Sequence, residues 1–295
     1  MDFSGRWPAA EVHDHGRGGR LGRVDVVAGE FSGGQPYLRV GRGPALVMVL
    51  GLMPRSGNPR GPSRWTSVAG ASAFARHFTV YLVNRRPGLP DGVTMADLAA
   101  DLAVAIEQDL GGSALVHGTS TGGSVALQLA VDHPSLVRRL VLASAACRLG
   151  PVGRWGQAEF ARRVRAGDRR RAWVPLVEPA VPAPLRPAAR AVCWLLGPWL
   201  VPADPADMLA TIDAEDAFDA EPQLGKVAAP VLVLGGGADP FYTVDLFRRT
   251  ADGVPDGRAV VVPRAGHVRA AASRRSVEAA ITFLRAGAPS PSPSR

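Results

Sequence analysis

Short apolar runs alternate with amphipathic segments through most of this chain, and that alternation limits the fold more than any other feature of the sequence. The apolar runs are Ala45–Leu50, Phe78–Val83, Ser113–Val116, Leu136–Ala143, Pro230–Leu234 and Arg258–Val262. Runs this short and this uniformly apolar are typical of strands covered on both faces. Helical periodicity follows Thr94, Ser120 and Thr243 and spans Arg274–Arg285. Strands that alternate with helices predict an α/β fold with a mostly parallel sheet flanked by helices.

The start of the alternation and a break within it define the expected domain organisation. Leu21–Phe31 and Pro36–Val40 are joined by a Ser-Gly-Gly turn without a helix, which predicts an antiparallel start to the sheet. Residues 147–225 lack the alternation and are rich in proline and tryptophan. We therefore expect a helical lid inserted between core segments 21–146 and 226–287. Residues 1–20 are expected to be irregular, and the Pro/Ser-rich residues 288–295 to be disordered.

The composition fits one large globular domain, or one domain carrying an inserted subdomain, without a membrane segment. Of the 295 residues, 46% are hydrophobic and 20% are charged, which is enough to bury a sizeable core. No apolar run is long enough to cross a bilayer, and the first residues lack the basic start and apolar stretch of a secretory signal. We therefore expect a cytoplasmic protein. Cys147 and Cys193 fit buried apolar side chains rather than a disulfide, redox or metal motif.

The net charge of +8 does not by itself predict an anionic partner. Lys226 is the only lysine, so the positive charge is almost all arginine and is spread along the chain. An arginine cluster between Arg162 and Arg171 alternates with apolar residues and is interpreted as the exposed face of a helix. Because no basic module with interleaved aromatic residues accompanies the charge, we predict neither nucleic-acid nor membrane binding. The expected partner is a small-molecule substrate, and a homodimer is left open.

The strongest local motif surrounds Ser120. Residues 116–123 are Val-His-Gly-Thr-Ser-Thr-Gly-Gly, a Gly-x-Ser-x-Gly pattern with a strand before it and a helix after it. Such a turn lifts the serine clear of the sheet and points backbone N–H groups and the positive end of the helix at charge that develops beside it. A plain glycine-containing turn is the alternative, but strand, turn and helix agree here. Ser120 is therefore the candidate nucleophile.

A serine nucleophile needs a base, and the base needs an orienting carboxylate. Among the six histidines, His267 follows the last strand and precedes the last helix, which places it at the carboxyl edge of a parallel sheet beside Ser120. His117 lies within the nucleophile strand, so we expect its side chain not to reach Ser120. Asp239 follows the strand Pro230–Leu234 at the same edge, and no acid closely follows the strand before it. A structural histidine and an Asp-Pro turn are the alternatives.

The order Ser120, Asp239, His267, each after its own strand, resembles the α/β-hydrolase superfamily. The resemblance extends from about residue 21 to residue 286, and the serine turn is its most specific part. It implies an eight-stranded sheet, a lid in the Pro/Trp-rich stretch, and a serine hydrolase in which these three residues form a catalytic triad.

The same resemblance implies an oxyanion hole made of backbone N–H groups, which we assign to Leu52 and Thr121. Many relatives carry a His-Gly pair where this chain has Leu50-Gly51. The glycine is retained and the histidine is replaced, so the backbone can still donate. Either Leu52 or Met53 then supplies the first N–H group.

The substrate pocket is expected in two regions of the chain. Its predicted residues are Met53, Trp155, Trp173, Trp194 and Trp199. The tryptophans either wall an apolar pocket or form the lid's own small core. The arginines between Pro54 and Trp65 could hold a substrate carboxylate, but a solvated loop is the plainer interpretation.

The expected function is hydrolysis of an ester, thioester or lactone of a small, fairly apolar molecule through an acyl-enzyme, without a metal or an organic cofactor. The same fold also hosts natural-product tailoring enzymes that cleave C–C bonds or act as lyases, cyclases or perhydrolases, and the pocket decides among them. A ligand-binding protein without turnover is the third class, and the complete triad argues against it.

Overall fold

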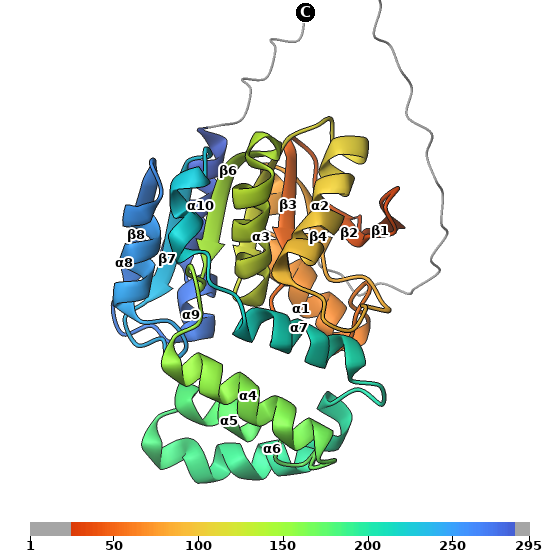
Figure 1. Ribbon diagram of the computed structural model, residues 1–295, viewed down its shortest axis with the longest axis vertical. Coiled ribbons are helices and arrows are strands. Elements are labelled where there is room, and N and C mark those ends of the chain that lie inside the picture. Colours follow the sequence, from red (N-terminus) through yellow and green to blue (C-terminus); the bar gives the residue numbers. More distant parts are fainter. Residues whose placement is uncertain (1–24, 287–295) are drawn as a thin grey trace, which may run out of the picture.

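A computed structural model of the protein describes residues 25–286 as one sheet with helices on both faces (Figure 1). The segment expected to be irregular at 1–20, the first residues of the strand expected from Leu21, and the tail expected at 288–295 lie outside the described residues. The strands are β1 (Val27–Glu30), β2 (Pro36–Val40), β3 (Ala45–Val49), β4 (Thr79–Val83), β5 (Ala114–Thr119), β6 (Val137–Ala143), β7 (Val231–Gly236) and β8 (Gly257–Val262).

The eight strands lie in the order β1-β2-β4-β3-β5-β6-β7-β8. β2 pairs antiparallel with both β1 and β4, and every other pairing is parallel. The turn between β1 and β2 is closed by a hydrogen bond of 2.9 Å from Phe31 N to Gln35 O, and Gly34 within it has a φ of 80°. The predicted eight-stranded, mostly parallel sheet with an antiparallel start is therefore confirmed.

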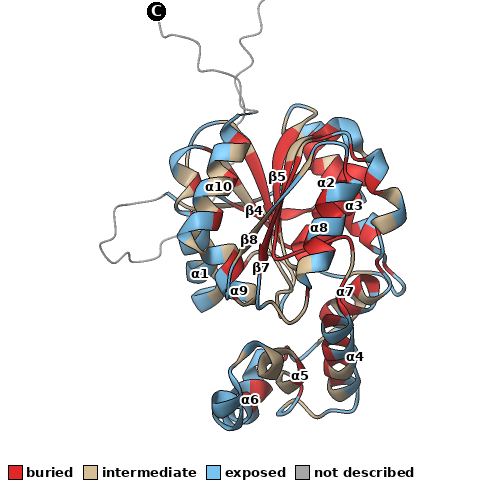
Figure 2. Cartoon of the chain, turned by 90° about the vertical axis from the view of Figure 1, so that its left-hand side faces the viewer, coloured by how far each residue is buried: buried red, intermediate tan, exposed pale blue. Residues whose placement is uncertain are grey.

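Helices flank the sheet on both faces (Figure 2). The helices of the described residues are α1 (Gly61–Ala71), α2 (Met95–Asp109), α3 (Thr121–Asp132), α4 (Pro151–Arg165), α5 (Val174–Val177), α6 (Arg186–Leu200), α7 (Ala206–Asp216), α8 (Val244–Gly253), α9 (His267–Ala272) and α10 (Arg274–Arg285). Buried side chains of α2, α3 and α8 form one hydrophobic core with the sheet, and those of α1 and α10 form a second core on the opposite face.

The sequence signals for α2 are visible as contacts. The Thr94 side chain accepts a hydrogen bond from Asp97 N at 3.2 Å, and the Asp97 carboxylate accepts one from Thr94 N at 2.8 Å. This reciprocal capping box satisfies two N–H groups that the first helical turn leaves unpaired. The helical periodicity expected after Thr94 is visible as a buried stripe of Leu98, Leu102, Ala105 and Ile106.

The expected loop between Pro54 and Trp65 ends earlier than the sequence indicates. α1 begins at Gly61 with Pro62 in its first turn, where a missing N–H costs no hydrogen bond and the fixed φ suits a helix. Its periodicity is weak because only Ala71 is fully buried, and Trp65 stays exposed. The interpretation of this whole segment as a solvated loop is therefore wrong from residue 61 onward.

Helices α4 to α7 follow β6 and precede β7 along the chain. They form a separate layer beyond the carboxyl ends of the strands (Figures 1 and 2). We call them the inserted helices. They occupy the stretch in which the sequence predicts a lid, and they share a small core of their own that includes Phe160, Val164, Met208 and Ile212. Asp207 of α7 accepts hydrogen bonds from the backbone N–H groups at positions 88 and 89 and so ties this layer to the loop after β4.

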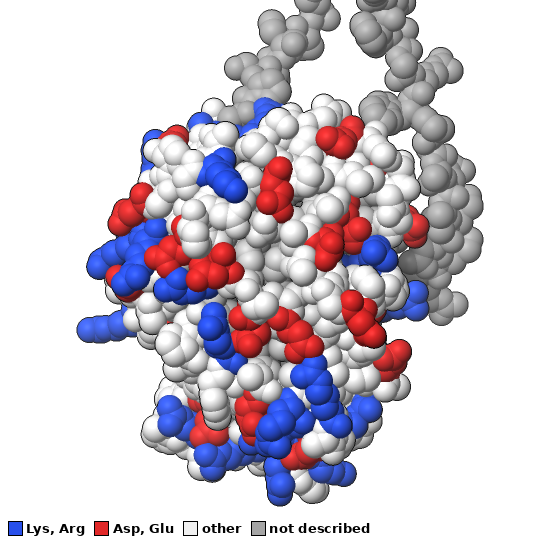
Figure 3. All heavy atoms as spheres, in the orientation of Figure 1, with Lys and Arg blue, Asp and Glu red and all other residues white. Residues whose placement is uncertain are grey.

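The arginine cluster belongs only in part to a helix face. Arg162, Arg163 and Arg165 lie on the last turn of α4, whereas residues 169–171 lie in the turn after it. Glu159 pairs with two of these arginines, and Asp213 pairs with the third. On the face shown in Figure 3, basic and acidic side chains are interspersed over the inserted helices.

Two further expectations concern cysteines and membrane segments. Cys147 and Cys193 are both buried and unpaired, as expected. Between residues 25 and 286, no helix combines the length and the apolar character needed to cross a membrane.

Candidate active site

Ser120 lies at a strained turn between β5 and α3. Its backbone angles, φ 52° and ψ −127°, are in a region that a residue with a side chain rarely adopts. The turn is held by a hydrogen bond of 3.0 Å from Ser120 N to Ala143 O on the neighbouring strand. The hydroxyl is consequently presented above the carboxyl edge of the sheet, at the N-terminus of α3.

The glycines on either side of Ser120 allow this turn because the backbone passes too close for a side chain. A Cβ atom on Gly118 would lie 2.4 Å from Gly122 O, and one on Gly122 would lie 2.4 Å from both Val49 O and Leu50 O. Contacts under 3 Å force the backbone to shift. The Gly-x-Ser-x-Gly spacing is thus a steric requirement of the turn.

Asp239 and His267 are brought together by the loops that follow β7 and β8. Two backbone hydrogen bonds join these loops, Gly237 N to Val262 O at 2.9 Å and Ala238 N to Ala265 O at 3.0 Å. His267 is the first residue of the short helix α9 rather than part of a loop. Both side chains therefore reach the edge of the sheet at which Ser120 stands.

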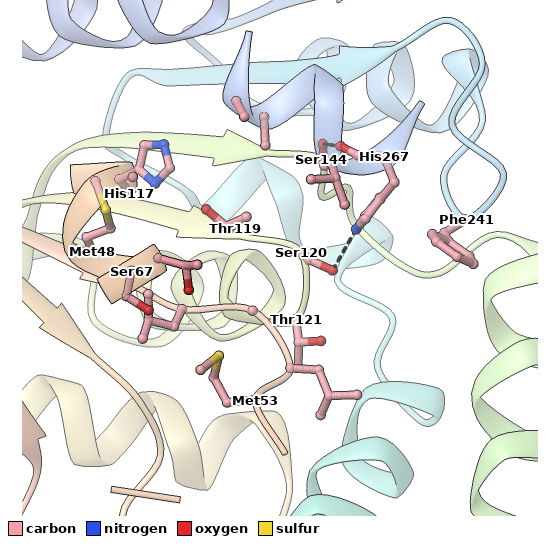
Figure 4. Close-up of a pocket in the computed structure, with 18 of the residues that line it drawn as sticks. Met48, Met53, Ser67, His117, Thr119, Ser120, Thr121, Ser144, Phe241 and His267 are labelled. Atoms are coloured by element: carbon pink, nitrogen blue, oxygen red, sulfur yellow. Dashed lines mark hydrogen bonds between the residues drawn. The ribbon is translucent and has the colours of Figure 1, made fainter. Parts of the chain in front are cut away.

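The three side chains form a continuous hydrogen-bonded chain (Figure 4 draws its serine end). His267 Nε2 lies 3.0 Å from Ser120 Oγ, and His267 Nδ1 lies 2.8 Å from Asp239 Oδ2. The Asp239 side chain is 0% exposed and that of His267 is 14% exposed. The other Asp239 oxygen, Oδ1, accepts hydrogen bonds from the backbone N–H groups of Phe241 and Tyr242. A buried carboxylate held in this way can fix the imidazole tautomer that leaves Nε2 free to take a proton from serine.

Aromatic rings and a hydroxyl hold His267 in place. Phe241 meets the imidazole edge-on with 5.0 Å between ring centroids, and Tyr242 stacks on it at 5.9 Å. Ser144, which follows β6, donates a hydrogen bond of 2.7 Å to His267 O. These contacts restrict the imidazole to the plane that connects Asp239 with Ser120.

Behind the serine turn lies a buried carboxylate, Glu215 of α7, which is 1% exposed. It accepts four hydrogen bonds, from Thr121 Oγ1 at 2.7 Å, Gln157 Nε2 at 2.7 Å, Ser124 Oγ at 2.9 Å and the Tyr242 hydroxyl at 3.3 Å. Burial, with the Glu215 charge as a second cause, raises the pKa of Tyr242 well above its usual value, so this hydroxyl stays a donor. Glu215 thereby joins the inserted helices to α3 and to the loop that carries Asp239.

A cavity of about 700 Å³ opens over Ser120 and has a mostly apolar lining. Of the predicted pocket residues, Met53 and Trp173 line it. Trp155, Trp194 and Trp199 do not line it, because they lie on outward faces of α4 and α6 and are about half or more exposed. Trp173 also packs against Phe160 in the core of the inserted helices. The arginines at positions 55 and 60, before α1, and at position 64, on α1, are likewise outside the lining.

The lining of the cavity extends to both sides of Ser120, and we call the two groups of lining residues its arms. One arm runs between the sheet and helices α1, α9 and α10, and it is lined by Met48, Phe74, Leu82, His117 and Val277. The other arm lies beneath the inserted helices, and it is lined by Leu149, Gly153, Trp173, Leu176 and Phe241. Figure 4 shows Met48, His117 and Thr119 on one side of Ser120 and Phe241 on the other. Within residues 25–286, no group of three His, Cys, Asp or Glu side chains could hold a metal ion.

Residues 51–280 match the model of the alpha/beta hydrolase family. The chain belongs to this family. A protein named as a putative carbamate hydrolase from Variovorax paradoxus is 30% identical over 224 residues, which are 69% of this chain and 79% of that protein. A pimeloyl-[acyl-carrier protein] methyl ester esterase from Nitrosomonas europaea is 27% identical over 238 residues, 77% of this chain and 90% of that protein.

Solved structures of alpha/beta hydrolases share the fold. An alpha/beta hydrolase enzyme from a deep-sea metagenome library of the Medee basin is similar with a TM-score of 0.70 over 88% of this chain and 98% of that chain. Its sequence identity is 15%, so the likeness concerns the fold alone. The predicted resemblance to the alpha/beta hydrolase superfamily is confirmed by the family match and by this fold.

The two amides predicted to form an oxyanion hole both lie at the cavity. Leu52 and Thr121 line it beside Ser120, and among the described residues neither backbone N–H donates a hydrogen bond. Thr121 is the first residue of α3, so its N–H has no acceptor within the helix. The backbone before Leu52 can approach Ser120 closely because Gly51 has no side chain. A Cβ atom on Gly51 would lie 3.3 Å from the Ser120 Cβ.

Removing the Leu52 N–H is expected to lower kcat about 100-fold or more, because one oxyanion donor typically contributes that much. Incorporation of the α-hydroxy analogue of leucine at position 52 replaces the amide by an ester and removes the donor without changing the side chain. The matched control carries the same change at Met53. Steady-state kinetics distinguish the two donors left open by the sequence: a loss only at position 53 would assign Met53, and no loss at either position would exclude both.

Four contributors to this site were missed by sequence reasoning. Ser144, Phe241 and Tyr242 each follow a buried strand at the same edge as Asp239, and that position is a signal that could have found them. Glu215 carries no such signal, because it lies on α7 and reaches Thr121 only through the packing of the inserted helices.

Proposed function

We propose that the protein is a serine hydrolase that cleaves an ester, thioester or lactone of a small and largely apolar molecule. The observation that carries the proposal is the hydrogen-bonded chain from Ser120 through His267 to buried Asp239, at the junction of the two arms of an apolar cavity. The cavity volume of about 700 Å³ lies within the range of small-molecule sites.

The chemistry follows from the positions of these groups. Ser120 Oγ attacks the substrate carbonyl carbon while His267 Nε2 takes the serine proton. The Leu52 and Thr121 N–H groups stabilise the oxyanion that forms, and the same imidazole returns its proton to the leaving alcohol or thiol. Water, deprotonated by His267, then attacks the acyl-enzyme and releases the acid. Asp239 stabilises the imidazolium in both halves of the reaction.

Labelling with a fluorophosphonate tests the proposal directly. The wild-type protein and the Ser120→Ala variant are each treated with the reagent, and their intact masses are measured. We expect one adduct on the wild type and none on the variant, because only an activated serine beside oxyanion donors reacts readily. A folded wild-type protein without an adduct would contradict acyl chemistry and would favour a lyase or a ligand-binding protein of the same fold.

A further inference from the structure

The arm of the cavity between the sheet and α1 has a mostly apolar lining, in which His117 is an imidazole beside the hydroxyl groups of Ser67 and Thr119. Met48, Phe74, Leu82 and Val277 line it together with this histidine. His117 stands on β5, three residues before Ser120, and Figure 4 shows it on the same side of Ser120 as Met48 and Thr119. Three residues of extended strand span about 10 Å. A chain attached to the scissile carbonyl can therefore reach this histidine without leaving the cavity.

The imidazole of His117 lacks a partner. Its Nδ1 is buried and has no hydrogen-bond partner among the described residues, and the residue is only 6% exposed. Its one ring contact is with Phe74, edge-on at 5.3 Å between centroids, which satisfies neither nitrogen. No hydrogen bond to the other ring nitrogen, Nε2, is found among the described residues either, although His117 lines the cavity. Most buried polar side chains in proteins are hydrogen-bonded, so an unpaired imidazole in a cavity lining indicates a partner that arrives with the ligand.

The His117 imidazole is uncharged near neutral pH. Burial lowers its pKa to about 4, against a smaller opposing effect of its own backbone. A neutral imidazole offers one donor and one acceptor nitrogen. A hydroxyl group both donates and accepts, so it pairs with either nitrogen whichever tautomer is present. Thr119 and Ser67, which also line the cavity, bring further hydroxyl groups to this region.

We propose that His117 is a specificity residue that binds a hydroxyl group on the substrate, some 10 Å along an otherwise apolar chain from the carbonyl that Ser120 attacks. The preferred substrates are then esters or thioesters of hydroxylated medium-length chains rather than of plain hydrocarbon chains. This inference rests on the proposed function, because that function places the substrate carbonyl at Ser120. Binding of the substrate hydroxyl group by His117 does not depend on turnover.

Binding of product-like acids provides the test. Titration calorimetry measures the dissociation constants of ω-hydroxy fatty acids and of the unsubstituted acids of the same length, over a series of lengths, on the wild-type protein and on His117→Leu. Leucine fills a similar volume without a polar atom. At the best length, we expect the ratio of the two constants to shift about tenfold against the hydroxy acid in the variant, as for one neutral hydrogen bond.

Two matched variants complete the design. Trp173→Phe removes an N–H group that is also buried and unpartnered, but in the arm beneath the inserted helices, and we expect it to leave the ratio unchanged. His117→Asn keeps a donor and an acceptor and is expected to restore part of the preference. Equal ratios in wild type and His117→Leu at every length would overturn the inference. Because calorimetry needs no reaction at Ser120, a negative fluorophosphonate result would contradict the proposed function without deciding this one.

Discussion

In the Ser120→Ala variant, kcat toward an ester that the wild-type protein hydrolyses is expected to fall by about four to six orders of magnitude. Ser120 Oγ is the atom that would bond to the acyl group. It also carries the proton that the His267 imidazole, 3.0 Å away, would take in the first step. The variant is expected to keep its fold, because among the described residues Ser120 Oγ forms a hydrogen bond only with that imidazole. Stopped-flow or long-time steady-state kinetics and a thermal melt measure the two properties side by side.

The sharper test of the triad is non-additivity. If Ser120 and His267 act as one unit, the double variant Ser120→Ala/His267→Ala is expected to be no slower than either single variant. Asp239→Asn keeps the shape of the side chain but removes the charge, and we expect kcat to fall by about 10⁴-fold. Near-normal turnover in Asp239→Asn would remove that residue from the mechanism. Losses that add in the double variant would mean that the serine and the histidine act in separate steps.

The order of chemistry-bearing residues along the chain was enough to predict where they meet. In a parallel sheet the carboxyl ends of all strands share one edge, so residues 119, 28 and 147 positions apart become neighbours without any knowledge of side-chain packing. Ser120, Asp239 and His267 each follow their own strand, β5, β7 and β8. Their meeting therefore requires only a parallel sheet, which the apolar runs predict, and the neighbouring positions of β5, β6, β7 and β8, which the structure shows.

The inserted helices could not be predicted in the same way, because their packing depends on which face of each helix is buried. α6 contains Pro198 and buries only Cys193 and Gly197 fully, while most of its large apolar side chains stay exposed, so burial does not follow apolar character along it. Trp194 turns outward, where the Arg170 guanidinium lies 4.1 Å from its ring centroid. Trp173 turns inward to the cavity. The sequence presents the tryptophans as equivalent, and only the packing separates them.

His117 is the opposite case: its position was predicted correctly, but its part in the cavity was not recognised from the sequence. His117 was expected not to reach Ser120, and the two side chains make no hydrogen bond. Alternation along β5 explains the separation, since His117 and Thr119 share the face of the sheet that α1 covers. That same alternation places the imidazole in an apolar arm of the cavity. A side chain excluded from catalysis by geometry is thereby available for binding.

Replacing Glu215 by alanine is expected to lower the free energy of unfolding by about 3–5 kcal/mol. The carboxylate is 1% exposed and accepts hydrogen bonds from α3, α4 and the loop after β7. Alanine leaves these buried donors without an acceptor and opens a cavity behind the serine turn. A thermal melt should show a decrease in Tm of roughly 5–15 °C.

Glu215→Gln is the matched control, because it keeps the volume and one acceptor oxygen. The Thr121 and Ser124 hydroxyls can rotate to accept from the new amide, and Gln157 can turn its Oε1, which has no partner in the structure, toward it. We therefore expect the glutamine variant to lose less than half of what the alanine variant loses. The fluorophosphonate labelling rate should follow the same order, since the network joins Thr121 to Tyr242, which stacks on His267. An alanine variant that melts within about 2 °C of the wild type would show that other contacts attach the inserted helices to the site. An alanine variant that is labelled at the wild-type rate would show that the Glu215 network does not position Ser120.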